Sequence, residues 1–171
     1  TNDVQAMLSP DATRETRESK HLPEDPSLGS YAVCMHEIVT RVQAGGASVA
    51  LCSLPPIGQD LTASVNVIVR EANAALHGVC ETTGAAYLPV YEHLADLLAS
   101  LGATGGPAWT GSWAPGLASL VEHFALGRSY DAIAVARGWI LSPDGVHMDS
   151  TGAGIIADVI AEWLESQSST E

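Results

Sequence analysis

Two kinds of apolar pattern alternate along this chain, and the alternation constrains the fold more than any other feature. Over residues 28–42, apolar positions recur at steps of three and four, as on one face of a helix, and Gly45-Gly46 supplies a stop signal. Residues 48–54, SVALCSL, form a short apolar run that two prolines end. A strand buried on both faces has this appearance.

The same pair of patterns then repeats. Residues 62–79 again show helical periodicity, and this helix is expected to end near Gly84. Residues 85–90, AAYLPV, are the next candidate strand, which Pro89 places near a sheet edge. The order helix, strand, helix, strand predicts an α/β domain with a parallel sheet.

The second half of the chain reads as helices around one long loop. Helices are expected over residues 92–101, 117–126 and 129–137, and the apolar stripe over 155–164 predicts a closing helix capped by Asp149 or Ser150. The Gly- and Pro-rich residues 102–116 form a loop that carries Trp109 and Trp113. Long loops in compact domains are often functional, but two tryptophans that pin the loop to the core are an equally good reading.

The two ends are polar. Residues 1–27 are interpreted as a solvated loop or flap, with a short helix paired through Arg14 and Glu18 as the alternative. Residues 167–171 are interpreted as a frayed tail.

Composition excludes several classes of protein. The 171 residues suit one domain with a real core. Seven basic against 20 acidic residues give a net charge of −13, which argues against nucleic-acid and anionic-membrane partners. No apolar run is long enough to span a membrane. Cys34, Cys52 and Cys80 are interpreted as buried free thiols, which weakly favours a reducing, cytoplasmic compartment.

The residues best suited to chemistry lie just before the closing helix, in the segment SPDGVHMD that follows the β-like Trp139-Ile140-Leu141. Asp144 and His147 are three residues apart, and the glycine between them lets the backbone turn. The carboxylate can then accept the Nδ1–H of His147, which leaves Nε2 free as a general base. Two other readings are a structural histidine at a helix start and a metal site formed by Asp144, His147 and Asp149.

Four segments in order resemble the SGNH (GDSL-type) serine hydrolases. The stretch SPDGVHMDSTGAGIIADVIAEWL, residues 142–164, is similar to the last conserved block and closing helix of that family, and it is the specific part. Residues 49–59, VALCSLPPIGQ, resemble the fourth strand and its loop. The stretch around Asn66 and Asn73 that ends in residues 85–87 resembles the next helix and strand. Thr1-Asn2-Asp3 resembles the end of the Gly-x-Asn-Asp block.

The resemblance implies a three-layer α/β/α, flavodoxin-like fold and ester hydrolysis through an acyl-enzyme. His147 would be the general base, Asp144 its orienting acid, and Asn2 an oxyanion donor. It implies no cofactor, and it leaves the substrate open among lipids, simple esters, thioesters and acetylated sugars.

The chain also departs from the family pattern. The Gly-Asp-Ser block is absent, Ser53 ends a strand before Leu-Pro-Pro, and Ser112 lies in the tryptophan loop, so neither serine is in the context of an activated nucleophile. We therefore expect residues 1–171 to be one partial domain that begins inside the Gly-x-Asn-Asp block, the third conserved block of the family. On its own it would supply the histidine and aspartate but not the serine, and it would be inactive.

Two other functions remain open. One is a non-catalytic domain that binds a partner or carbohydrate through the Trp109/Trp113 loop. The other is a hydrolase that uses an N-terminal threonine, Thr1, as nucleophile, with its own amine as base.

Overall fold

The structure, a computed structural model, describes residues 2–102 and 107–168. These residues are mostly helical, with one small parallel sheet of two strands, so the coarse α/β expectation is confirmed. The chain divides into two compact units: Thr1–Leu54 with Ala63–Leu88, and Pro55–Thr62 with Pro89–Glu171. Each unit is described by itself below.

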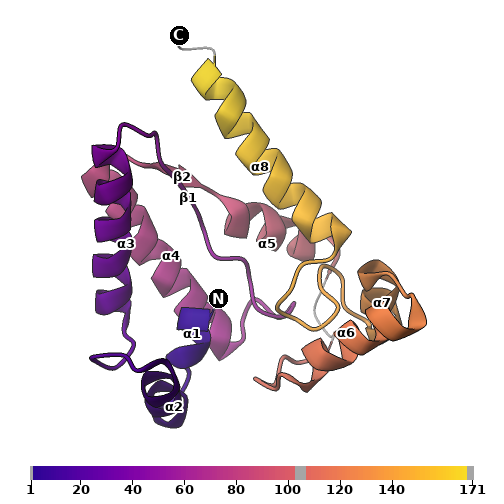
Figure 1. The fold of residues 1–171 in the computed structure, drawn as a ribbon. Helices are drawn as coiled ribbons and strands as arrows, with labels where there is room; N and C mark the ends of the chain where they lie inside the picture. The colour runs from indigo at the N-terminus through magenta and orange to yellow at the C-terminus, as the bar shows by residue number, and fades with distance from the viewer. Residues whose placement is uncertain (1, 103–106, 169–171) are drawn as a thin grey trace. The chain divides into compact units, whose positions relative to one another are not determined.

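The first unit contains the sheet and four helices (Figure 1). Its elements are α1 (Asn2–Ala6), α2 (Pro10–Lys20), α3 (Leu28–Ala44), β1 (Ala50–Cys52), α4 (Ser64–Thr83) and β2 (Ala86–Leu88). The two strands pair in parallel, with Ala50, Leu51 and Cys52 opposite Ala86, Tyr87 and Leu88. The predicted order of helix, strand, helix, strand is therefore correct in this part of the chain.

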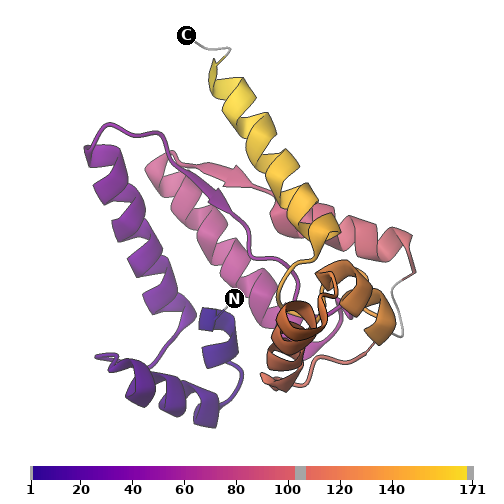
Figure 2. The ribbon, with the colours of Figure 1, turned by 45° about the vertical axis from the view of Figure 1, so that its right-hand side comes forward.

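Helices α3 and α4 lie side by side in both ribbon views (Figures 1 and 2). Val39 on α3 is fully buried in a cluster with Val79, Cys80 and Ala85. Gly84 ends α4 in the left-handed conformation, at the position predicted from the sequence. Burial is less complete than the apolar patterns suggested. Strand β1 is only half-buried, and Ile38 and Val42 on α3 are exposed.

The interpretation of residues 1–27 as a loop is wrong for most of this segment, because α1 and α2 lie within it. The Ser9 hydroxyl accepts a hydrogen bond from the N–H of Ala12 at 3.1 Å, and Pro10 occupies the first helical turn of α2. These are a standard cap and a favoured first residue of a helix. Arg14 forms its ion pair with Asp11, at 2.6 Å, rather than with Glu18.

The second unit contains α5 (Val90–Ser100), α6 (Ala114–Leu126), α7 (Tyr130–Arg137) and α8 (Ser150–Ser168). Helix α5 packs against α8, and α6 packs against α7. Residues 139–141, expected to be β-like, are not a strand. Their hydrogen bonds go to the end of α7 and to the residue before α8. The N–H of Trp139 donates to the carbonyl of Ala134, and the carbonyl of Leu141 accepts from the N–H of Asp149.

Two expectations from composition can be compared with the structure. None of the helices that the structure describes is long and apolar enough to cross a membrane. The three cysteines are free, but only Cys80 is buried; Cys52 is half-buried and Cys34 is exposed, so the expectation of three buried thiols is correct for one of them.

Candidate active site

The structure brings Asp144 and His147 together in the turn between α7 and α8. Asp144 Oδ2 lies 2.6 Å from His147 Nδ1. An ionised carboxylate can only accept hydrogen bonds, so the proton of a neutral ring is held on Nδ1, and Nε2 is left with a free lone pair. The two side chains differ sharply in exposure, at 5% for Asp144 and 76% for His147. A shielded acceptor thus orients a ring that solvent or a ligand can reach.

The turn itself is built by short-range hydrogen bonds. Asp144 Oδ1 accepts from the backbone N–H groups of Val146 and His147, each at 2.9 Å. The Ser142 hydroxyl accepts from the N–H of Gly145 at 2.7 Å and donates to Asp144 Oδ1 at 3.2 Å. Both carboxylate oxygens of Asp144 are therefore engaged, one by the turn and one by the histidine ring.

Gly145 is required by this geometry. Its φ of 89° lies in the left-handed region, and a Cβ at this position would lie 3.0 Å from the Trp139 ring and 3.1 Å from Trp109. Its carbonyl accepts a hydrogen bond from the N–H of Gly58 at 2.7 Å. The loop after β1 therefore holds the turn from a distant part of the sequence.

The charge on Asp144 is maintained despite its burial. Burial raises the pKa of this carboxyl, but hydrogen bonds from the backbone and ring of His147 and from the backbone of Val146 outweigh it, and the resulting pKa lies below the ordinary value of an aspartate. The group is therefore a carboxylate at neutral pH. That is the state that can orient and stabilise an imidazolium.

Asp149, which the metal-site reading grouped with this pair, has a different role. Its Oδ1 accepts from the N–H groups of Thr151 and Gly152, each at 3.0 Å, so it caps the start of α8 as predicted. Among residues 2–102 and 107–168, no three His, Cys, Asp or Glu side chains are placed to hold a metal ion.

The other candidate residues lie on other elements of the chain. Asn2 opens α1 in the first unit, whereas the Asp144–His147 pair lies in the second. Ser53 is buried and follows β1, and its N–H donates to the carbonyl of Leu88. The Ser112 hydroxyl accepts from the N–H of Ala114 at 3.2 Å, near the start of α6. Thr1 lies outside the described residues.

The tryptophan loop separates into two kinds of residue. Trp109 is half-buried and packs beside residues 144–147, the DGVH turn, because its Cδ1 lies 3.1 Å from the position that a Cβ on Gly145 would occupy. Trp113 has 77% of its surface exposed at the start of α6. The reading of two pinning tryptophans therefore holds for Trp109 and not for Trp113. Residues 103–106 of this loop lie outside the described part.

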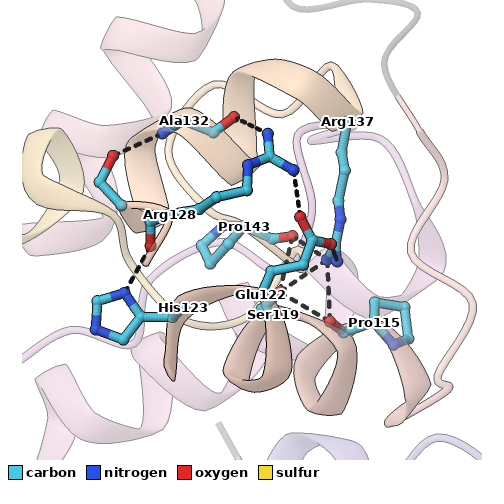
Figure 3. A network of polar contacts seen from close by, with 9 residues as sticks. Pro115, Ser119, Glu122, His123, Arg128, Ala132, Arg137 and Pro143 are labelled. Carbon is cyan, nitrogen blue, oxygen red and sulfur yellow. Dashed lines mark hydrogen bonds and ion pairs between the residues drawn. The ribbon is translucent and has the colours of Figure 1, made fainter. Parts of the chain in front are cut away.

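Sequence reasoning missed one set of residues around the site. Figure 3 shows Arg137 of α7 with Ser119 and Glu122 of α6 and with Pro143, which precedes the DGVH turn. Gly116 of α6 lies close to the carboxylate of Asp144. Nothing near them in the sequence resembles a site motif. A lone arginine late in α7 was the only available signal.

Comparison of the chain with protein-family models, curated proteins and solved structures found no match. The chemistry of the site therefore rests on its own residues and geometry.

Proposed function

We propose that this chain carries the histidine–aspartate half of an SGNH-type serine hydrolase with a three-layer, flavodoxin-like fold, which cleaves carboxylic esters through an acyl-enzyme. The contact of 2.6 Å between Asp144 Oδ2 and His147 Nδ1 is the observation that carries this proposal. It couples a shielded carboxylate to an exposed imidazole, which is the base-and-orienter arrangement of such enzymes.

In this proposal, His147 Nε2 removes the proton from a serine hydroxyl as the oxygen attacks the ester carbonyl. The imidazolium that forms is stabilised by Asp144, and it then protonates the departing alkoxide. Water repeats the sequence to release the acid. Asn2 is proposed to donate its side-chain amide to the oxyanion.

The nucleophile is proposed to come from sequence outside these 171 residues. The His147 ring contacts the carboxylate of Asp144, and neither Ser53 nor Ser112 has the sequence context of an activated nucleophile. The described residues also contain no Gly-Asp-Ser segment. The proposed substrate is a small-molecule or lipid ester, and no cofactor is required.

The test uses the chain together with whatever residues its gene encodes ahead of Thr1, assayed with a short-chain aryl ester. His147→Ala is expected to reduce kcat/KM by about 10³-fold or more, because the serine then lacks its base. His93→Ala, an exposed histidine of α5, is the matched control and should leave kcat/KM unchanged. Activity that survives His147→Ala within about tenfold would show that the proposed base is wrong.

The exposure of Trp113 favours a second candidate, a binding domain without catalysis. In that case a carbohydrate or protein ligand would change the tryptophan emission of the chain, and Trp113→Phe would abolish the change. Titrations with candidate ligands that leave the emission unaltered would count against this function.

A further inference from the structure

Helix α6 approaches the carboxylate of Asp144 so closely that a side chain at the point of contact would push the carboxylate aside. A Cβ on Gly116, in the first turn of α6, would lie 3.0 Å from Asp144 Oδ2. Real Cβ atoms rarely come so near another atom, so any larger residue would displace the carboxylate by a few tenths of an ångström. Oδ2 is the oxygen that contacts the His147 ring, at 2.6 Å.

Arg137 holds the same turn one residue earlier. Its Nη1 donates to the carbonyl of Pro143 at 2.9 Å, and also to Ser119 Oγ at 2.7 Å and the carbonyl of Pro115 at 3.0 Å. Pro143 immediately precedes Asp144, whereas the other two acceptors belong to α6 (Figure 3). One guanidinium thus ties the start of the DGVH turn to the helix that meets the Asp144 carboxylate.

The guanidinium of Arg137 is itself held in place by an ion pair. Arg137 Nη2 lies 2.6 Å from Glu122 Oε1, and Arg128 pairs with the other oxygen of the same carboxylate (Figure 3). Hydrogen bonding by Arg137 is the main cause that lowers the pKa of Glu122, so the pair is charged at neutral pH. Ser119 is 2% exposed, and the side chains of Arg137 and Glu122 are each 23% exposed, so these contacts are partly shielded from water.

We infer that Gly116 and Arg137 are positioning residues for the Asp144–His147 pair: Gly116 leaves room for Asp144 Oδ2 at the histidine ring, and Arg137 fixes the turn against α6. An effect of Gly116 and Arg137 on catalysis rests on the proposed function. Their effect on the orientation and tautomer of the His147 ring does not depend on it. Small displacements matter here, because errors of about 1 Å in catalytic groups can cost about 10² in rate.

The first experiment separates positioning from stability. Gly116→Ala in α6 and Gly154→Ala in α8 each replace a helical glycine by the better helix former, which favours the helix by about 0.5–1 kcal/mol. A Cβ at Gly154 meets nothing within 4 Å, so this variant is the matched control. If only helix stability mattered, the two substitutions would behave alike.

The readout is the tautomer of the His147 ring in the 171-residue chain. Long-range ¹H–¹⁵N NMR spectra at about pH 9, where imidazoles are neutral, distinguish a ring protonated on Nδ1 from one protonated on Nε2. We expect wild type and Gly154→Ala to show the Nδ1–H form, and Gly116→Ala to show a mixture with an undiminished melting temperature. A Gly116→Ala spectrum identical to that of wild type would overturn the inference.

Arg137→Lys tests the contacts of the guanidinium. Lysine keeps the charge but lacks the planar fork of donors, so it cannot reach Pro143, Ser119 and Glu122 together. We expect the same tautomer mixture. Arg41→Lys is the control, because the ion pair of Arg41 is with Glu37, an exposed glutamate on the same helix α3. A wild-type tautomer in Arg137→Lys would remove Arg137 from the inference.

A second readout uses the active enzyme of the proposed function. There Gly116→Ala should lower kcat by about tenfold to 10² with KM little changed. Full activity in Gly116→Ala despite a mixed tautomer would overturn the catalytic part of the inference. Full activity in His147→Ala would overturn the proposed function. The effect of Gly116 on the His147 tautomer would still hold, because that measurement does not depend on activity.

Discussion

At the scale of single residues, the site depends on one carboxylate that serves two partners. Asp144 Oδ1 accepts the N–H groups that fold the turn, and Oδ2 accepts the ring proton of His147. The sequence predicted the second contact because Asp, Gly and His at this spacing can meet within one turn. It could not predict the contacts of Gly116 and Arg137, because these depend on how α6 and α7 return to the turn, which no local pattern encodes.

The first prediction concerns pH. Because the folded-state pKa of Asp144 is lowered, its carboxylate contributes stability that is fully present above the ordinary aspartate value of about 3.9 and is lost as the pH falls through the lower folded value. Asp144→Asn should therefore reduce the free energy of unfolding by about 1 kcal/mol at pH 5, where ionic hydrogen bonds are replaced by neutral ones.

Denaturant unfolding of both proteins from pH 5 to about pH 2 checks this prediction. The gap between wild type and Asp144→Asn should narrow as the pH falls below about 4, because the wild-type carboxylate is then protonated. Asp158→Asn, at an exposed position of α8, serves as the control and should show little effect at any pH. A gap that stays constant to pH 2 would mean that ionisation of Asp144 does not contribute to stability.

At the scale of elements, local signals and long-range packing had different success. The helices α3 and α4 were predicted because their apolar periodicity and terminal glycines agree. Helix α2 was only the alternative to a loop, because it has no buried residue; the Ser9 cap, Pro10 and the ion pairs of Arg14 and Arg17 define it instead. Residues 139–141 were expected to be β-like from composition, but strand formation needs a partner strand, and the sequence does not reveal that these residues instead link α7 to α8.

The start of α8 provides a prediction at this scale. Asp149 Oδ1 caps two N–H groups of the helix that follows the site, so Asp149→Ala should lower the free energy of unfolding by about 1 kcal/mol. Thermal and urea unfolding measure the change, with Glu162→Ala, on the exposed surface of α8, as the control. Equal stability of Asp149→Ala and Glu162→Ala would show that the cap contributes nothing.

At the scale of the whole molecule, the three thiols report on how completely the chain is folded. Cys34 is exposed, whereas burial raises the pKa of Cys52 and of Cys80 and so lowers their thiolate fraction. The sequence indicated free thiols correctly, but it could not show that Cys34 lies on the outward side of α3, because that depends on which neighbours cover the helix.

We predict that a disulfide-exchange reagent labels Cys34 rapidly in the native protein and labels Cys52 and Cys80 slowly. In denaturant all three should react at similar rates, and mass spectrometry after timed labelling identifies each site. Cys34→Ser should remove the fast phase and leave the slow ones. Rapid native labelling of Cys80 would contradict the buried cluster around Val39.

Strand β1 has one further consequence. Within the described residues, β1 hydrogen-bonds to β2 alone, so its other edge leaves backbone groups directed away from the sheet. Such an edge is a template on which a strand of another chain can add. The net charge of −13 opposes that encounter by repulsion between molecules, and added salt screens this repulsion. Self-association of the chain is therefore favoured by the unpaired edge of the three-residue strand β1 and opposed by the net charge. Added salt weakens the opposing repulsion.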